Sequence, residues 1–368
     1  MKPVLQIVVQ FRISANNERG DKKVKKRFIC VFISLTLCGL LGLASIGLTA
    51  EEPWVRKADM PTARIDLSTS VVNGIIYAIG GEGTRITTAG VEVTDNLSTV
   101  EAYDPTTDMW TTKADMPTRR QELSTSAVNG IIYAIGGWFS SNRSTVEAYD
   151  PVTDTWTKKA DMPTARSGLS TGVVNGIVYA IGGWVSSSTF TSAVEAYDPA
   201  TNTWTKKADM PTPRGYFSIS AVNGIIYAIG GWDGSFRGEV EAYDPMTDTW
   251  TKKADMPRQN LGMSSCALNG LIYVIGGWGP VATVNVYDPL TNTWTSRPDM
   301  TTRRAWTSSS MVNGKIYTIG GGTEGTNSAT PVNVVEEYNW LLAPERVPQS
   351  VNAQGKLAVQ WGKLKNSN

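Results

Sequence analysis

Short runs of apolar residues, bounded by turn residues, dominate the chain from residue 53 onward. In one representative stretch, Leu123–Val128 mixes apolar and hydroxyl side chains, Ile131–Ile135 is apolar throughout, and Val146–Tyr149 resumes the apolar pattern before Trp156. Runs of this length, rich in Val, Ile, Thr, Tyr and Trp, are typical of β-strands, and the body of the chain shows no amphipathic helical period. The pattern therefore predicts a unit of four short strands.

The connections between these strands carry their own signals. The first two strands of each unit are joined by Asn-Gly, which tolerates the positive φ angles of a type I′ hairpin turn. These pairs begin at Asn73, Asn129, Asn175, Asn223, Asn269 and Asn313. The third and fourth strands are joined by Asp-Pro in five units, as at Asp150–Pro151, and this pair initiates turns.

The unit recurs six times along the chain. A Gly-Gly doublet follows the second strand at intervals of 56, 46, 48, 46 and 44 residues. The doublets begin at Gly80, Gly136, Gly182, Gly230, Gly276 and Gly320. A marker tyrosine ends the third strand, at Tyr103, Tyr149, Tyr197, Tyr243, Tyr287 and Tyr338. A marker tryptophan lies in the fourth strand, at Trp54, Trp110, Trp156, Trp204, Trp250 and Trp294.

The doublet, the tyrosine and a tryptophan seven residues later resemble the kelch repeat over about residues 53–340. This resemblance implies an all-β, six-bladed kelch β-propeller with one repeat per blade. Trp54 marks a fourth strand, but no first, second or third strand of a unit comes before it. The sixth unit has the opposite gap, because no tryptophan follows Tyr338 at the regular spacing. The N-terminal strand is therefore expected to complete the sixth blade as its outer strand, which closes the ring and removes an exposed sheet edge. Residues 51–340 then form the propeller, and 341–368 form a tail with no assigned role.

The first 50 residues have a different character. Lys22–Arg27 is a basic cluster, Phe28–Leu48 carries no charge, and Thr49 and Ala50 precede two glutamates. This order is typical of a secretory signal peptide. The apolar run is longer than usual for a signal, so an uncleaved membrane anchor is the alternative, and the only route to a membrane partner. Both interpretations predict export of the body to the periplasm, the cell surface or the medium.

Composition excludes several classes of function. The chain has no histidine, which excludes His-ligated metal sites and Ser-His-Asp triads, and no metal, cofactor or catalytic residue is predicted. Residues 1–50 hold eight of the 34 basic residues but only two of the 33 acidic residues. The body is therefore mildly acidic, which argues against a nucleic-acid partner.

The loops between the second and third strands vary most among the units, and they share one face of the propeller with the links between units. Variable loops on a rigid scaffold are where function concentrates. One link position carries arginine in five units, at Arg64, Arg120, Arg166, Arg214 and Arg304. We expect either a guanidinium rim that binds an anion, as in kelch adaptors that bind acidic peptides, or an ion pair for each arginine with a carboxylate such as Asp66 or Glu122.

Two sets of aromatic residues are expected on the same face. Trp138, Trp184, Trp232 and Trp278 directly follow their doublets, and they either offer flat amphipathic area to a sugar or peptide or pack against the next blade. The position two residues after the arginine varies most among the units. It holds Asp66, Glu122, Gly168, Tyr216, Gly262 and Trp306. Of these, we expect Tyr216 and Trp306 to contribute to specificity.

Together these features predict a non-enzymatic extracytoplasmic binding module that presents an Arg- and Trp-bearing face to a protein, peptide or glycan, with acidic ligands among the candidates. The alternative is a periplasmic sugar mutarotase or epimerase, because the chain distantly resembles the N-acetylneuraminate epimerases, six-bladed kelch proteins that act on an anionic sugar. Galactose oxidases, which share kelch-like blades, need histidine ligands for copper that this chain lacks.

Overall fold

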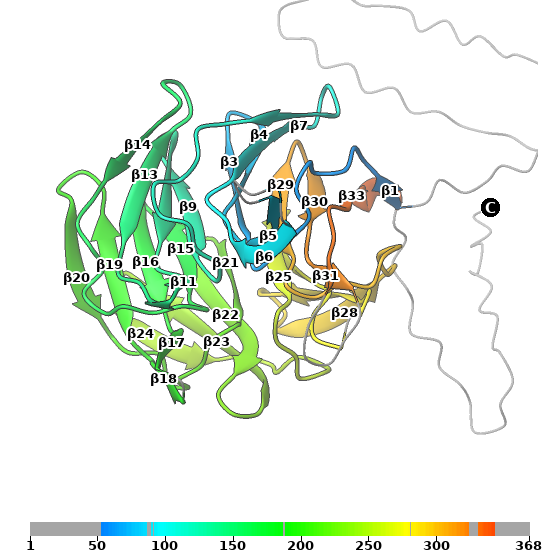
Figure 1. Cartoon of the computed structure of the whole chain (residues 1–368). Helices are drawn as coiled ribbons and strands as arrows, with labels where there is room; N and C mark the ends of the chain where they lie inside the picture. The colour runs from blue at the N-terminus through cyan, green and yellow to red at the C-terminus, as the bar shows by residue number, and fades with distance from the viewer. Residues whose placement is uncertain are drawn as a thin grey trace, which may run out of the picture. The chain divides into compact units, whose positions relative to one another are not determined.

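A computed structural model describes residues 53–86, 90, 92–186, 188–279, 281–323 and 330–342, and within them it contains six four-stranded antiparallel sheets (Figure 1). The sheets follow one another in chain order, which confirms the predicted all-β propeller with one blade per repeat. The expected signal or anchor (1–50) and most of the expected tail (343–368) lie outside the described residues. Within the described ranges, no helix is long and apolar enough to cross a membrane.

Each blade, numbered one to six, runs from an inner strand to an outer strand. The inner strands are β3 (Ser68–Val72), β9 (Ser124–Val128), β15 (Ser170–Val174), β21 (Ser218–Val222), β25 (Ser264–Leu268) and β29 (Ser308–Val312). The second strands are β4 (Ile75–Ile79), β10 (Ile131–Ile135), β16 (Ile177–Ile181), β22 (Ile225–Trp232), β26 (Leu271–Ile275) and β30 (Lys315–Ile319). The third strands are β7 (Val100–Asp104), β13 (Val146–Asp150), β19 (Val194–Asp198), β23 (Phe236–Asp244), β27 (Val284–Asp288) and β33 (Val335–Tyr338). The outer strands are β8 (Met109–Thr112), β14 (Thr155–Lys158), β20 (Thr203–Lys207), β24 (Thr249–Lys252), β28 (Thr293–Arg297) and β1 (Trp54–Arg56).

Local chemistry explains this order within a blade. The second strand is almost entirely buried, as its continuous apolar run requires, whereas the outer strand β14 exposes threonine and lysine, which discourage pairing with another sheet edge. Asn129 and Gly130 have φ angles of 49° and 81°, which confirms the positive-φ turn between β9 and β10.

The hydrophobic core lies between neighbouring blades. Tyr77 and Ile79 of blade one pack in one cluster with Ile132 and Tyr149 of blade two, and equivalent clusters join the following blades. Another cluster joins blade six to blade one, where the Tyr317 and Tyr103 rings lie 5.9 Å apart. Each blade therefore depends on both neighbours to bury its apolar faces.

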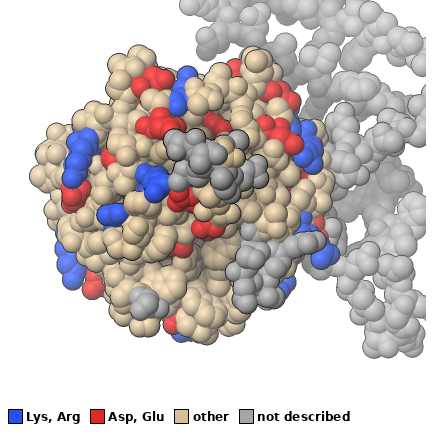
Figure 2. Space-filling model, in the orientation of Figure 1, with Lys and Arg blue, Asp and Glu red and all other residues tan. Residues whose placement is uncertain are grey.

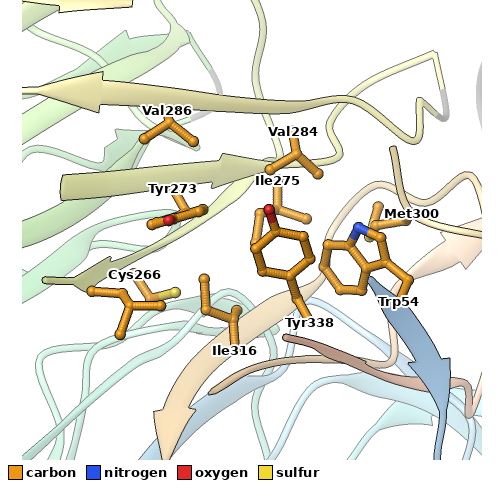
Figure 3. Close-up of a cluster of buried hydrophobic side chains, with 10 residues drawn as sticks. Trp54, Cys266, Tyr273, Ile275, Val284, Val286, Met300, Ile316 and Tyr338 are labelled. Carbon is orange, nitrogen blue, oxygen red and sulfur yellow. The ribbon is translucent and has the colours of Figure 1, made fainter. Parts of the chain in front are cut away.

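The N-terminal strand is the outer strand of blade six, as predicted. β1 pairs antiparallel with β33, with Trp54 opposite Tyr338, and the two rings lie 4.8 Å apart (Figure 3). The indole Nε1 of Trp54 donates a 3.0 Å hydrogen bond to the carbonyl of Pro298 in the link from blade five. One blade is thus built from segments 284 residues apart, and this pairing holds the first and last strands together.

Candidate ligand-binding site

Short hairpins rise from the face that carries the variable loops. They are β5 (Glu82–Ile86) with β6 (Glu92–Asn96), β11 (Trp138–Phe139) with β12 (Ser141–Asn142), β17 (Trp184–Ser186) with β18 (Thr189–Phe190), and β31 (Gly322–Thr323) with β32 (Thr330–Pro331). Backbone bridges join this face to the links between blades, pairing Gln121 with Trp138 and Ser167 with Trp184. The variable loops and the links therefore form one surface, as the sequence predicted.

The five arginines expected at the rim are completely buried, and each forms an ion pair with a glutamate from the third strand of its own blade. The pairs are Arg64–Glu101 at 2.6 Å, Arg120–Glu147 at 2.7 Å, Arg166–Glu195 at 3.0 Å, Arg214–Glu241 at 2.8 Å and Arg304–Glu336 at 2.5 Å. The expected anion-binding rim is therefore wrong, because no guanidinium reaches solvent. The alternative of an ion pair for each arginine is correct, but with partners other than Asp66 and Glu122.

The geometry around Arg120 shows what these pairs do. Its Nη1 donates 2.8 Å hydrogen bonds to the carbonyls of Gly136 and Thr145, at the ends of the second and third strands. Its partner Glu147 also accepts a 2.8 Å bond from the Thr118 hydroxyl. Burial lowers the pKa of Arg120 to about 10, still far above neutral, so the guanidinium remains charged. The arginine therefore fixes the backbone beneath the Gly-Gly doublet.

Blade five lacks both members of the pair. Asn260 occupies the arginine position and Asn285 occupies the glutamate position. A lone buried charge is strongly destabilising, so losing both together is physically reasonable. Because the arginine and the glutamate are absent from the same repeat, the sequence contained a signal that could have identified the glutamates as the partners of the arginines.

A closed ring of backbone hydrogen bonds surrounds the mouth of the central channel. Its six members, which we call the link ring, lie two residues after the arginine position: Asp66, Glu122, Gly168, Tyr216, Gly262 and Trp306. Each amide donates to the carbonyl of the same position in the preceding blade, over 2.7–3.3 Å, and the bond from Asp66 to Trp306 completes the circle. All six residues have positive φ angles, between 53° and 65°. The link ring therefore brings together the positions that vary most among the repeats.

The two aromatic members of the link ring lean over glycines of the preceding blades. A Cβ on Gly168 would lie 3.0 Å from the Tyr216 ring, and one on Gly262 would lie 2.8 Å from the Trp306 ring. The Tyr216 and Trp306 rings meet edge to face at 5.3 Å. Small residues at alternate positions thus leave room for large aromatic rings at the channel mouth.

The charged members of the site are carboxylates. Asp66 and Glu122 are half-buried, and Glu82 lies beside them because it pairs with Ile65, which precedes Asp66. Burial and the proximity of the other carboxylates raise the pKa of Asp66 well above its usual range, and burial raises the pKa of Glu122. Tyr216 donates a 2.9 Å hydrogen bond to Glu122. The mouth is therefore acidic, opposite in sign to the expected guanidinium rim.

The four tryptophans that follow the doublets lie at the bases of the loops. Trp184 stacks on Phe190 at 5.3 Å and meets Tyr216 at 5.6 Å, so it joins the link ring to its own hairpin. Trp278 meets Trp306 at 5.8 Å, and Trp232 packs on Phe236 at 5.1 Å. Trp138 is the most accessible of the four, with 38% of its surface exposed. Contact between these residues and a ligand stays a prediction.

Two cavities open at this site. One, of about 240 Å³, is the channel, which is lined by the link ring and by hydroxyl groups of the inner strands. The other, of about 520 Å³, lies beside it and shares Glu122 and Tyr216 with the channel mouth. Its further lining comes from Gln121, Trp138, Ser141, Asn142, Ala165, Ser167, Trp184, Val185 and Ser186.

Two residues that line the larger cavity each have a buried polar atom without a partner. The indole Nε1 of Trp184 and the amide Oε1 of Gln121 form no hydrogen bond with any of the described residues. Buried polar groups are nearly always satisfied, so these two atoms are exceptions in the wall of the cavity. The sequence did not indicate Gln121, because of the equivalent positions in the other repeats only Ser167 carries a polar side chain.

The surface around the propeller is mixed in charge. On the face drawn in Figure 2, acidic (red) and basic (blue) side chains are interspersed over a mainly uncharged surface. In the described part of the chain, no three Asp, Glu or Cys residues are grouped so as to hold a metal ion. The chemistry that the site offers is therefore aromatic packing, hydrogen bonding and negative charge.

Comparison with known proteins identifies relatives of the repeats. The Kelch motif matches five segments of the chain, residues 63–117, 119–163, 165–211, 213–257 and 260–301, which together exceed half its length. An F-box/kelch-repeat protein of Arabidopsis thaliana is 36% identical over 89 residues, covering 24% of this chain and 22% of that protein. Kelch-like ECH-associated protein 1B of Danio rerio is 32% identical over 84 residues, covering 23% of this chain and 14% of that protein. These matches span less than a quarter of either relative.

A solved structure has the same fold. The structure of YjhT superposes with a TM-score of 0.64 and covers 76% of this chain and 99% of YjhT, at 17% sequence identity. At that identity the likeness concerns the fold alone.

Proposed function

The chain belongs to the kelch-repeat family, and on that premise we propose that it is a non-enzymatic binding module whose hairpin-bearing face holds a protein partner. The observation that carries this proposal is the cavity of about 520 Å³ lined by Trp138, Trp184 and Tyr216. Concave sites with aromatic walls and a few convergent polar groups are typical of ligand recognition. Ser141, Asn142 and Ser167 supply polar groups in the lining.

The scaffold suits binding because it is rigid. The link ring and the buried Arg–Glu pairs fix the backbone on which the aromatic residues stand. Tyrosine and tryptophan lose little conformational entropy when they contact a partner, which favours them at interfaces. The site therefore needs little reorganisation to receive its ligand.

The epimerase alternative is weakened by the charge of the site. Recognition of an anionic sugar was expected to rest on the arginines, but these are buried in ion pairs with glutamates. The charged groups at the channel mouth, Asp66, Glu122 and Glu82, would repel a carboxylate. Binding of a partner is thus favoured over chemistry on such a sugar.

We also propose that the module works outside the cytoplasm. This proposal rests on the basic cluster Lys22–Arg27 and the uncharged run Phe28–Leu48. A fusion of the full chain to alkaline phosphatase, which is active only after export, tests it. Phosphatase activity supports export, and an inactive fusion that accumulates in the cytoplasm contradicts it.

Binding by the hairpin face can be tested with the full chain on arrays of peptides and of glycans. Trp138→Ala and Trp184→Ala should each weaken capture of the bound class at least about tenfold, because each removes a large aromatic wall of the cavity. The matched control is Leu290→Ala, since Leu290 is 93% exposed on a turn of the opposite face.

The two possible results separate cleanly. Loss of binding in the tryptophan variants, with normal binding by Leu290→Ala, supports the proposal. Normal binding in both tryptophan variants, or capture of glycans alone, contradicts a protein partner on this face.

A further inference from the structure

The charge and shape of the channel mouth point to a particular class of ligand, and this inference rests on the proposed function. We propose that the mouth binds a cationic side chain, a lysine ammonium or an arginine guanidinium, carried by an extended segment of the protein partner. The expected ligand is thus opposite in charge to the acidic ligand that the sequence suggested.

Two carboxylates line the proposed position of the cation, and a third lies near them. Asp66 and Glu122 are consecutive members of the link ring, joined by a 3.1 Å backbone hydrogen bond, and Glu82 lies beside Asp66 through the pairing of β5 with β2 (Arg64–Ile65). Among the described residues, none of the three forms an ion pair, although the five buried arginines are all paired. The mouth therefore holds carboxyl groups without a cationic partner, and a cation from outside would stabilise their ionised forms.

Aromatic rings complete the environment of the cation. Tyr216 and Trp306 lie on the same link ring as the two acids, and their rings meet edge to face at 5.3 Å. The electron-rich face of such a ring attracts an ammonium or guanidinium group, most strongly where water is excluded. Carboxylates and aromatic faces together favour an organic cation over a neutral group.

The neighbouring cavity suits the backbone of an extended peptide. It shares Glu122 and Tyr216 with the mouth, and its lining includes the polar side chains of Ser141, Asn142 and Ser167. A peptide unit offers one carbonyl and one N–H group, which can bond to such hydroxyl and amide side chains. A segment lying in this cavity can place one basic side chain at the channel mouth.

The acids give the interaction a pH dependence of known sign. The groups that face Asp66 and Glu122 are each other, Glu82, Ser167 and Tyr216. Because the pKa of Asp66 and that of Glu122 are both raised, these groups lose their negative charge at a higher pH than ordinary carboxyl groups do. A bound cation favours the ionised form, so affinity should rise with pH until both acids are ionised.

The experiment measures binding of blocked peptides of sequence acetyl-Ala-Ala-Xaa-Ala-Ala-amide to the full chain by tryptophan fluorescence or NMR. The position Xaa is Lys, Arg, norleucine or Glu. We expect the Lys and Arg peptides to bind at least about tenfold more tightly than the norleucine peptide, and the Glu peptide to bind least. Glu122→Gln and Asp66→Asn should each reduce that preference severalfold.

A matched control removes the same charge elsewhere. Asp255 is exposed and pairs with Lys252, so Asp255→Asn tests whether net charge alone matters. Circular dichroism of each variant shows whether it is folded. The preference for a basic side chain should survive in Asp255→Asn and shrink in the two mouth variants.

Failure of this inference is distinguishable from failure of the proposed function. Equal binding of the Lys and norleucine peptides, or a preference that Glu122→Gln leaves intact, overturns the cationic ligand while Trp184→Ala can still abolish binding. If binding of every peptide is insensitive to Trp138→Ala and Trp184→Ala, the proposed binding face itself is wrong.

Discussion

At the scale of the residue, burial decides what a charge does. The five arginines of the links are among the largest fully buried side chains, and each has a glutamate and backbone carbonyls as partners. The sequence shows the arginines at equivalent positions but not that their partners follow 27 to 37 residues later. Only folding of the blade brings the link onto its third strand.

The buried pairs should therefore contribute strongly to stability. Arg120→Ala should lower the free energy of unfolding by about 3 kcal/mol or more, because Glu147 would remain as an unpaired buried charge. Urea denaturation measures the change. Arg56→Ala is the control, since its exposed pair with Asp59 should contribute less than about 1 kcal/mol.

Blade five suggests how the loss can be compensated. Arg120→Asn combined with Glu147→Asn copies Asn260 and Asn285, and the double variant should be more stable than Arg120→Ala. If the double variant is less stable than Arg120→Ala, the loss of stability in Arg120→Ala does not come from the unpaired charge of Glu147.

The acids at the channel mouth should have the opposite effect on stability. A carboxyl group whose pKa is raised on folding penalises the folded state above that pKa, and the penalty disappears as the pH falls and the group is protonated. Asp66→Asn should therefore raise the stability at pH 7.5, and asparagine also tolerates the positive φ of 53°. Thermal melts of both proteins from pH 7.5 down to about pH 3 should converge. A gain that is constant with pH would contradict the role of ionisation.

At the scale of the element, repeated local signals determine most of what the sequence predicts. Strands, Asn-Gly turns and Asp-Pro turns are encoded within a few residues, so they could be predicted from one repeat. The conformation of the link between blades is not encoded by local residues in this way, because its left-handed backbone is held by hydrogen bonds to the preceding blade. Asp66, Glu122, Tyr216 and Trp306 adopt φ angles that are unusual for their residue types.

The glycines of the links should control how the aromatic rings sit. Gly168→Ala should displace the Tyr216 ring, since the added Cβ would lie 3.0 Å from it, and should weaken the bond from Tyr216 to Glu122. We expect a cost of about 1–2 kcal/mol and reduced peptide binding. Thermal melting and fluorescence titration measure the two effects.

A second glycine separates contact from backbone strain. Gly74 has a φ of 80°, but a Cβ there would meet nothing within 4 Å. Gly74→Ala should therefore lower stability without changing peptide binding. Equal loss of binding in both variants would mean that the Tyr216 position is not what Gly168 determines.

At the scale of the whole molecule, closure makes the ring cooperative. β1 forms the outer strand of blade six, and Trp54, only 3% exposed, packs on Tyr338 between blades five and six. Deletion of residues 51–60 should therefore lower the melting temperature of the entire propeller, not of one blade, in a single calorimetric transition.

A point substitution tests closure without a deletion. Trp54→Ala should lower the stability by about 3–5 kcal/mol, whereas Val55→Ala, on the exposed side of the same strand, should have little effect. An unchanged melting temperature in Trp54→Ala would contradict the role of this strand in closing the ring.

The number of blades could be predicted because the Gly-Gly, Tyr and Trp markers recur six times. The closing strand could be predicted because the first marker is a fourth-strand tryptophan and the last repeat lacks its own fourth strand. The nature of the site could be predicted only in part. Tyr216, Trp306 and Trp184 do come together, but the sign of the charge was wrong because the arginines point into the blades while Asp66 and Glu122 face the channel. Residue type alone does not show which charged side chain of a link points into the blade and which points into the channel.

The link ring has one further consequence. Its hydrogen bonds join main-chain atoms only, so the width of the aperture does not depend on which side chains stand there. Different side chains can thus occupy this frame where they tolerate a positive φ angle and where a neighbouring glycine leaves room for a large ring. Such a ring would let closely related propellers recognise different ligands through a few substitutions at these positions while the rest of the propeller stays the same.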